Sequence, residues 1–294
     1  MIYMKLCGGI YLGDNVEISA ILVPMKKLTT QDWISHMHEW CDEADQISRH
    51  YFDSDNLSIE IKSDQSPVTI ADQKIEETLI KSALKLFPDL SILGEESEAL
   101  KEFQGAEKQA MVPGKEGTFR LIVDPIDATR NFVRGIPYVA TLLGLEVDGV
   151  VVAGMVSSGI RKDRWWGSKG NGSFYGGKQI KCSTIDNLDE SLALHSSLFG
   201  VESGKHNEQM FNLLSKTPRQ RAFGDFYNHM IVANGCAEFA IDFGLKPWDV
   251  APLKIIIEEA GGTLTSLSGE NTIYESNIVS SNGVLHDTVL GYFK

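Results

Sequence analysis

Two aspartates stand at the end of an apolar strand within the segment Leu121–Asn131. Asp124 and Asp127 follow the run Leu-Ile-Val, and a short helix is expected to begin at Ala128-Thr129. Carboxylate and carbonyl oxygens are the ligands that hard divalent cations prefer. The free N–H groups at the start of a helix attract anions such as phosphate. This one loop therefore predicts both halves of a metal-dependent phosphate site.

Two further carboxylates stand where an element begins or ends, which is where proteins usually present catalytic groups. Glu95 follows an apolar run in a Gly-Glu-Glu-Ser segment, and Asp249 opens a Trp-Asp-Val-Ala-Pro segment near the C-terminus. A simpler explanation exists for Asp124 and Asp127, because aspartate is a common helix cap. Capping alone is disfavoured, because Glu95 and Asp249 complete a set of four acids that suits a metal site.

The three segments, taken in order, resemble motifs of the inositol monophosphatase-like superfamily of magnesium-dependent, lithium-sensitive phosphatases. The shared motifs are Gly-Glu-Glu, Asp-Pro-Ile-Asp-x-Thr, and Trp-Asp-x-Ala followed by Glu-Ala-Gly-Gly. The resemblance runs from residue 30 or so to the C-terminus. Within the superfamily, residues 129–135, 164–166 and 224–226 are most similar to the histidinol-phosphate phosphatase branch.

This resemblance implies a set of metal ligands. Glu95, Asp124 and the carbonyl oxygen of Ile126 would bind one Mg²⁺, and Asp124, Asp127 and Asp249 would bind a second, in a site that takes two or three ions. In such sites one ion activates water and the other stabilises the leaving oxygen. The residues themselves support the carbonyl ligand, because the proline between the two aspartates fixes the backbone and lets the carbonyl of Ile126 point toward the carboxylates.

The catalytic residues that the resemblance implies are Thr129, Asp72 and Glu95. The hydroxyl of Thr129 would orient the attacking water, and the carboxylate of Asp72 behind it could take the proton. Asp72 has an open alternative, because it also stands in the first turn of a predicted helix, where a negative charge is favourable. Position 128 is alanine where the family usually has glycine. The extra methyl group is tolerable if φ of Ala128 is negative.

Substrate contacts are expected from both halves of the chain: Ala128, Thr129, Arg130, Gly224, Asp225 and Asp242. Arg130 would face the phosphate, or it is a solvated helix charge. Asp225 stands where inositol-cleaving members have threonine. An acidic residue there suits a cationic substrate, and histidinol phosphate carries an ammonium and an imidazole. The alternative for Asp225 is a helix cap. Asp242 lies where the family places an acidic substrate contact.

Composition excludes several classes of function. The chain has 294 residues, a net charge of −13 and a pI of about 5.0. This argues against a nucleic-acid polymer as partner, which would need a basic patch, but not against phosphate ligands, because metal ions supply positive charge locally. The four cysteines are scattered without C-x-x-C spacing and predict reduced thiols in a cytoplasmic protein. No apolar run approaches the ~20 residues of a membrane helix, so no membrane partner is expected.

Hydrophobic periodicity predicts the elements that position these residues. Helices are expected from Thr29 or Thr30 to Tyr51, and over residues 71–87, 208–214, 226–235 and 250–260. Strands are expected over 57–61, around Gly94, up to Asp124, over 139–147 and 150–156 as a hairpin within the strand-like region 138–181, and over 191–195, 238–243 and 276–280. The polar residues 99–118 predict a long loop, and Trp165 and Trp166 are expected to pack in a hairpin or dimer contact.

The predicted fold class is α/β, with an α+β first half and an α/β second half. The resemblance implies a layered α-β-α-β-α sandwich of the sugar phosphatase and inositol monophosphatase type. Residues 1–28 are expected to form an extension outside the core. Their apolar stretch, residues 10–23, is only mildly apolar and is interrupted by two acids. Residues 29–182 would carry most metal ligands, and residues 183–294 the remaining ligand and substrate contacts.

The sequence therefore predicts a Mg²⁺-dependent phosphomonoesterase that hydrolyses a small polar phosphate without a covalent enzyme intermediate. Histidinol phosphate is the leading substrate. Inositol 1-phosphate and 3′-phosphoadenosine 5′-phosphate, the substrate of a 3′(2′),5′-bisphosphate nucleotidase, are the alternatives. A non-catalytic regulatory protein on the same fold is disfavoured because all the expected acidic ligands and Thr129 are present. We also expect a homodimer.

Overall fold

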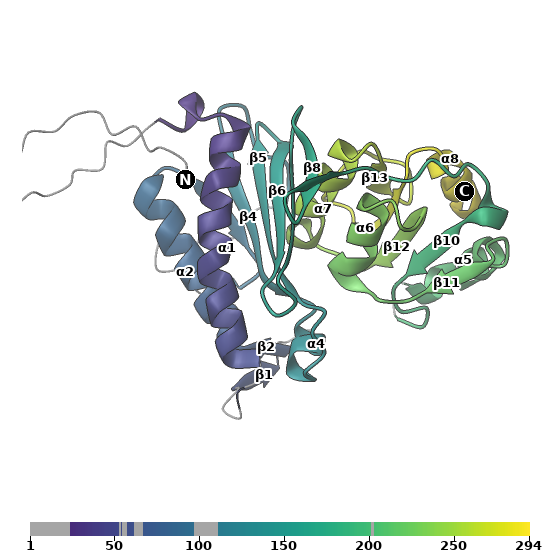
Figure 1. Ribbon diagram of the computed structural model, residues 1–294, viewed down its shortest axis with the longest axis horizontal. Coiled ribbons are helices and arrows are strands. Elements are labelled where there is room, and N and C mark those ends of the chain that lie inside the picture. The colour runs from purple at the N-terminus through teal and green to yellow at the C-terminus, as the bar shows by residue number, and fades with distance from the viewer. Residues whose placement is uncertain (1–23, 53, 55–57, 62–66, 97–110, 201–202) are drawn as a thin grey trace, which may run out of the picture.

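The computed structural model describes residues 24–52, 54, 58–61, 67–96, 111–200 and 203–294, which form alternating layers of helices and sheets (Figure 1). The helices α1 (Thr30–Phe52) and α2 (Ile70–Leu86) cover one face of a seven-stranded sheet. Between this sheet and a five-stranded sheet lie α6 (Asp225–Ala233) and α7 (Pro247–Glu259), and the outer layer holds α5 (Asn207–Leu214) and α8 (His286–Leu290). The predicted α-β-α-β-α sandwich is confirmed.

The seven-stranded sheet is antiparallel except for its first pair. Its strands in spatial order are β3 (Ser91–Gly94), β4 (Phe119–Asp127), β5 (Ala140–Val147), β6 (Val150–Ser158), β7 (Asp163–Ser168), β8 (Gly172–Tyr175) and β9 (Lys178–Ile180). β3 runs parallel to β4, and Gly94 at the end of β3 pairs with Val123. The next residues, Glu95 and Asp124, therefore lie at the same end of the two strands. A short antiparallel pair, β1 (Ile59–Ile61) and β2 (Pro67–Thr69), precedes α2.

The five-stranded sheet has three parallel strands that end at one edge. Its spatial order is β11 (Arg219–Arg221), β10 (Leu192–His195), β12 (Phe239–Phe243), β14 (Asn277–Ser281) and β13 (Thr263–Ser266). β10 lies between β11 and β12 and is parallel to both, whereas β14 is antiparallel to β12 and β13. The remaining short elements are α4 (Thr129–Val133) and the 3-10 turns η1 (Met25–Lys27), η2 (Leu188–Glu190), η3 (Ser203–His206) and η4 (Gly291–Phe293).

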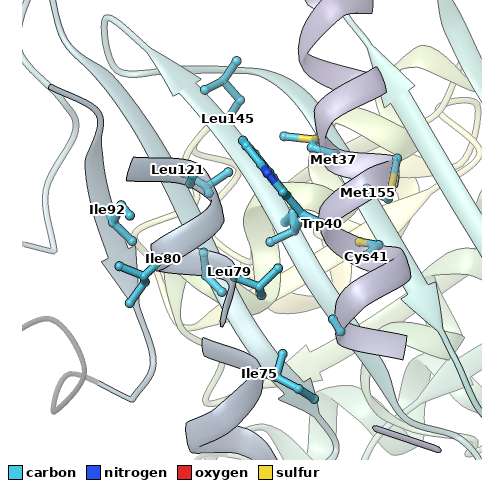
Figure 2. Close-up of a cluster of buried hydrophobic side chains, with 14 of the residues drawn as sticks. Met37, Trp40, Cys41, Ile75, Leu79, Ile80, Ile92, Leu121, Leu145 and Met155 are labelled. Atoms are coloured by element: carbon cyan, nitrogen blue, oxygen red, sulfur yellow. The ribbon is translucent and has the colours of Figure 1, made fainter. Parts of the chain in front are cut away.

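The core of the first half lies between α1, α2 and the seven-stranded sheet. Thr29 caps α1 as predicted, with its hydroxyl accepting the N–H of Asp32 at 3.2 Å while Asp32 accepts the N–H of Thr29 at 2.8 Å. Trp40 of α1 lies among apolar side chains of α2 and the sheet (Figure 2). Full burial of such side chains contributes about 1.5–3 kcal/mol each. This core fixes α2, which carries Asp72, against β4.

A row of three glycines lets α7 lie directly on the other face of that sheet. Gly144, Gly154 and Gly167 stand opposite one another on β5, β6 and β7. A Cβ atom on Gly154 would come within 2.8 Å of the Cα atom of Pro252 in α7. Any side chain in this row would therefore push α7 away from the sheet. Because Asp249 stands in the first turn of α7, the glycine row also determines how near Asp249 comes to β4.

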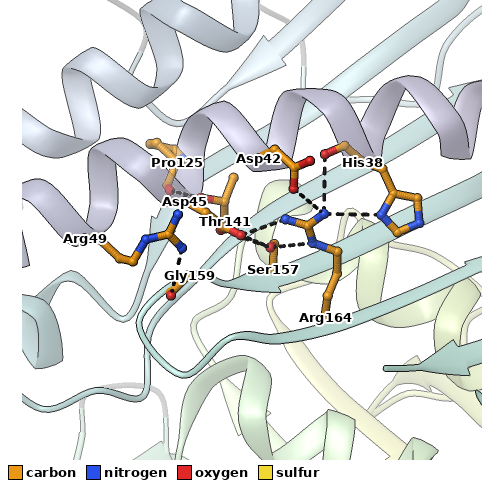
Figure 3. A network of polar contacts seen from close by, with 9 residues as sticks. All are labelled: His38, Asp42, Asp45, Arg49, Pro125, Thr141, Ser157, Gly159 and Arg164. Carbon is orange, nitrogen blue, oxygen red and sulfur yellow. Dashed lines mark hydrogen bonds and ion pairs between the residues drawn. The ribbon is translucent and has the colours of Figure 1, made fainter. Parts of the chain in front are cut away.

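A buried ion-pair network ties α1 to β6 and β7 (Figure 3). The guanidinium of Arg164 contacts Asp45 at 2.7 Å and Asp42 at 2.8 Å, and it donates to the hydroxyl of Ser157 at 2.9 Å. Burial raises the pKa of Asp45, although Arg164 opposes this shift. Removing one member of such a pair would leave the other charge buried alone. Arg164 therefore serves to hold α1 on the sheet.

Two residues of the predicted N-terminal extension pack against the core. Met25, in η1, and Leu28, directly after it, are partly buried against the cluster around α1. Residues 1–23 lie outside the described residues, as do residues 99–110 of the predicted long loop. The predicted division at residue 182 falls between β9 and η2, and it stays a prediction, since α7 from the second half packs on the sheet of the first.

The other predicted elements are found, with ends displaced by a few residues, and β2, β11, β13 and α8 were not predicted. Trp165 is buried and stacks on Tyr175 at 4.6 Å, and Trp166 stacks on Phe174 at 5.6 Å. Both tryptophans thus pack within the hairpins of the sheet. Among the helices that the structure describes, none combines the length and apolar character needed to cross a lipid bilayer.

Candidate active site

The two aspartates of β4 stand on either side of an irregularity in the strand. The pairing of β4 with β5 shifts register between Asp124 and Asp127, and Thr141 of β5 donates to the carbonyl of Pro125 at 2.8 Å. An extra residue in a strand bends it and re-aims its side chains. Asp124 is 1% exposed and Asp127 is 8% exposed. The proline-containing bulge therefore presents both carboxylates at one buried spot.

Asp249 joins these two carboxylates from the start of α7. One oxygen from each of Asp124, Asp127 and Asp249 lies within 4.8 Å of the others. Two of these acids are also held at the start of a helix: Oδ2 of Asp249 accepts the N–H of Lys246 at 2.7 Å, and Oδ2 of Asp127 accepts the N–H of Phe226 at 2.9 Å. Each carboxylate has a second oxygen, so these contacts do not exclude a metal ion at the cluster.

The acidic cluster fits a divalent cation. Burial raises the pKa of Asp124 well above 3.8, and the charges of Glu95, Asp127 and Asp249 raise it further. Burial also raises the pKa of Asp127, and it raises that of Asp249 to about 7. Oδ1 of Asp124 is buried and has no hydrogen-bond partner among the described residues. Unpaired buried carboxylates are costly, and a bound cation removes that cost.

Glu95 and the carbonyl of Ile126 lie at the same place. Glu95 directly follows β3, lines the pocket described below, and acts electrostatically on Asp124, Asp249 and Asp72. The carbonyl oxygen of Ile126 accepts the hydroxyl of Thr129 at 3.0 Å. The structure thus brings all five predicted metal ligands together around the end of β4.

Thr129 and Asp72 are also in contact. The hydroxyl of Thr129 lies 3.3 Å from Oδ1 of Asp72. The other oxygen of Asp72 accepts the N–H of Thr69 at 2.8 Å and its hydroxyl at 2.5 Å, which completes a capping box at the start of α2. Burial raises the pKa of Asp72 to about 6, with Glu95 adding to the shift. Asp72 therefore both caps α2 and reaches Thr129.

A pocket of about 430 Å³ opens beside this cluster. Six predicted residues line it: Glu95, Ala128, Thr129, Arg130, Gly224 and Asp225. The sequence did not single out five further lining residues: Asn131, Ser196, Ser197, Ala222 and Phe223. Four of these five directly follow the carboxyl ends of the parallel strands β10 and β11, where α/β sheets bind ligands. A predicted strand ending at His195 was the available signal for the two serines.

Ala128 has a positive φ, whereas its methyl group was expected to be tolerable only at a negative φ. Its φ is 66° and its ψ is 45°, in the left-handed region, where the sequence required a negative φ. This conformation turns the chain from β4 into α4, and glycine adopts it without strain. The condition under which the methyl group is tolerable is therefore not met, because the chain takes a positive φ in the turn after Asp127.

Two acids of the second half of the chain lie at or near the pocket. Asp225, a lining residue, is the first residue of α6, and burial raises its pKa to about 6 while the positive charge of Arg130 opposes the shift. Asp242 on β12 is buried, and burial raises its pKa to about 7, with the charge of Asp225 adding to the shift. Oδ2 of Asp242 has no partner in the described part of the chain. The pocket therefore combines Arg130, which follows Thr129, with the acid Asp225.

Comparisons with known proteins place the chain in a family. The model of the inositol monophosphatase family matches residues 29–294. The histidinol-phosphatase of Mycobacterium tuberculosis is 36% identical over 254 residues, which cover 85% of this chain and 93% of that protein. Inositol monophosphatase 1 of Bos taurus is 32% identical over 245 residues, which cover 79% of this chain and 84% of that protein.

A solved structure agrees with this assignment. The IMPase of Thermotoga maritima has a TM-score of 0.75 against this chain at 28% identity, and the match covers 89% of this chain and 96% of that one. The fold, the acidic cluster at the end of β4 and the pocket beside it are those expected of the family's motifs. The chain belongs to the inositol monophosphatase family and is a phosphoric monoester hydrolase.

Proposed function

We propose that the protein hydrolyses histidinol phosphate with Mg²⁺ as cofactor. The observation that carries the choice of substrate is Asp225 in the lining of the pocket, with the buried Asp242 near enough to interact with it electrostatically. A carboxylate removed from water is stabilised by a cation. The ammonium group of histidinol phosphate supplies that cation, and its phosphate, carried by the neighbouring carbon, would lie beside Arg130.

The metal end of the site uses the acids around β4. Glu95, Asp124 and the carbonyl oxygen of Ile126 would hold one Mg²⁺, and Asp124, Asp127 and Asp249 would hold a second. When bound, the ions supply positive charge that lowers the pKa of water and offsets the charge on the phosphate and the leaving oxygen. The buried and unpartnered Oδ1 of Asp124 supports this assignment.

Thr129 and Asp72 would position the attacking water and remove its proton. The hydroxyl of Thr129 has one proton and two acceptors in reach, Asp72 at 3.3 Å and the carbonyl of Ile126 at 3.0 Å. When the hydroxyl donates to Asp72, its lone pairs are free to accept the proton of a water molecule in the pocket. Asp72, with a pKa of about 6, can then take the threonine proton. The phosphate would lie against Ala128, Thr129 and Arg130.

Two alternative substrates fit the same family. The alcohol part of inositol 1-phosphate is a neutral polyol, and it would add no cation beside Asp225 to the charge of Arg130. The second phosphate of 3′-phosphoadenosine 5′-phosphate would approach Asp225 and be repelled. The similarity to the Bos taurus inositol monophosphatase 1 supports the first of these alternatives. A homodimer and a cytoplasmic location are also proposed, and light scattering and cell fractionation test them.

Phosphate release from the three esters, with Mg²⁺ and with EDTA, tests the proposal. Because a charged hydrogen bond contributes about 1.5–3 kcal/mol, kcat/KM for histidinol phosphate should exceed that for inositol 1-phosphate by at least about tenfold. EDTA should abolish both activities. A preference for inositol 1-phosphate would refute the substrate, and no release from any ester with Mg²⁺ would support the non-catalytic alternative.

A further inference from the structure

An aromatic side chain forms one wall of the otherwise polar pocket. Phe223 lines the pocket between β11 and α6 and is 42% exposed. The other lining residues are acids, an arginine, an asparagine, small residues and a threonine. An exposed aromatic ring is unfavourable in water. Its position in the wall of a substrate pocket therefore requires an explanation.

The ring of Phe223 rests on two tyrosines. It meets the ring of Tyr227 edge-on, with centroids 5.6 Å apart and planes at 87°, and its centroid lies 6.4 Å from that of Tyr138. The two tyrosine rings lie 4.8 Å apart. These three residues form an aromatic shelf. It joins the pocket at a second point, because Asn131, another lining residue, donates to the carbonyl of Tyr138 at 3.1 Å.

An arginine packs against the two tyrosine rings of the shelf. The guanidinium of Arg161, in the turn between β6 and β7, lies 4.6 Å from the ring of Tyr138 and 5.5 Å from that of Tyr227. Asp163 fixes this arginine at 2.9 Å and also accepts the hydroxyl of Tyr175 at 2.6 Å. Cation–π contacts of this kind contribute about 0.5–2 kcal/mol each. The shelf therefore comes from two separate parts of the chain, and Arg161 from a third part holds it in place before any ligand arrives.

We propose that Phe223 is a specificity-determining residue whose ring packs against a planar heteroaromatic ring of the substrate. The inference rests on the proposed function. It assigns a binding place to the imidazole ring of histidinol phosphate, which the acids of the pocket do not account for. Asp225 and Phe223 line the same pocket, so a substrate with its ammonium at Asp225 can bring an attached side chain to the shelf. A flat imidazole gains an aromatic contact there, whereas a polyol ring has no π-face to offer.

Two phosphate esters separate the ring from the ammonium. Histidinol phosphate carries both groups, and O-phosphoethanolamine carries the ammonium without a ring. We expect Phe223→Ala to lower kcat/KM for histidinol phosphate about tenfold more than for O-phosphoethanolamine, with the difference mainly in KM. Phe223→Tyr should keep the wild-type ratio, and Phe223→Leu, which keeps apolar bulk without a ring, should behave like Phe223→Ala. Asp225→Asn should lower both activities.

The matched control is Phe211→Ala, which removes another half-exposed phenylalanine, on α5 away from the pocket, and should change neither activity. Thermal melting checks that each variant folds, and Phe223→Leu carries the test if the alanine variant does not. Equal losses on the two ammonium substrates, or a wild-type ratio in Phe223→Leu, would overturn the inference while leaving the proposed function intact. If the wild-type protein releases no phosphate from histidinol phosphate, the proposed function fails, and this inference fails with it.

Discussion

The buried carboxylate of Asp72 is expected to cost the metal-free protein stability, and Asp72→Asn should reveal that cost. Burial raises the pKa of Asp72 from 3.8 to about 6, which corresponds to about 3 kcal/mol against the ionised group at high pH. Asparagine holds the Thr69 cap less well, at a cost of about 1 kcal/mol. The variant should therefore be more stable by about 2 kcal/mol, or by roughly 4 °C in Tm.

The sign of this effect depends on pH. Because the pKa of Asp72 is raised on folding, the folded protein binds more protons than the unfolded chain between pH 3.8 and about 6. Wild-type stability therefore falls as pH rises through this interval. The gain in Asp72→Asn should be absent near about pH 4 and complete by about pH 8. Circular dichroism melting in EDTA at these two pH values measures it.

The same variant should lose activity, because a general base contributes about 10²–10⁴-fold to the rate. Asp32→Asn is the matched control, since Asp32 makes the same capping contacts with Thr29 at the exposed start of α1. Hydrogen bonds from Thr29 lower the pKa of Asp32, so its contribution to stability is present above pH 3.8 and lost in acid. Asp32→Asn should lower Tm slightly at high pH and retain activity. A lower Tm for Asp72→Asn at about pH 8, or a kcat within about tenfold of wild type, would refute the reasoning.

Three further predictions concern the pocket. Asp225→Thr should lower kcat/KM for histidinol phosphate about 10- to 100-fold more than for inositol 1-phosphate, and equal losses in steady-state kinetics would leave Asp225 as a helix cap only. Ala128→Gly should raise Tm by roughly 2 °C, because glycine removes up to about 1 kcal/mol of strain at a φ of 66°, and an unchanged or lower Tm would argue against that strain. LiCl should inhibit hydrolysis at millimolar concentration, whereas KCl of the same ionic strength should not. A small cation held by Asp124, Asp127 and Asp249 would delay the departure of the product phosphate from the site. Identical effects of the two salts would contradict this prediction.

The acids of the cluster could be predicted because each belongs to a short local pattern. Asp124 and Asp127 follow an apolar strand, and Glu95 and Asp249 stand at the end and the start of elements that the sequence itself outlines. The contact of Asp127 with the start of α6 could not be predicted, because its partner, the N–H of Phe226, lies far away in the sequence. The sequence posed capping and metal binding as alternatives, whereas two oxygens per carboxylate allow both.

The pocket residues that follow β10 and β11 were harder to predict. Ser196, Ser197 and Phe223 gather only because β10 and β11 pair in parallel, and β11 has just three residues, too few for a periodic signal. The positive φ of Ala128 was equally hidden, since it results from the path of the chain between β4 and α4 and not from the residue type. Local patterns thus gave the chemistry, and the pairing of distant strands gave the shape of the pocket.

Mg²⁺ titration of the wild-type protein and Asp124→Asn, with phosphate release from histidinol phosphate measured on the same samples, tests the central claim most directly. Asp124 interacts electrostatically with Glu95, Asp127 and Asp249. Its neutralisation should therefore remove both the Mg²⁺ binding seen by calorimetry and the release of phosphate. The variant should still melt cooperatively. Asp189→Asn, at an exposed aspartate in η2, is the control and should behave as wild type. Mg²⁺-dependent phosphate release by Asp124→Asn at the wild-type rate would contradict the metal site and the mechanism built on it.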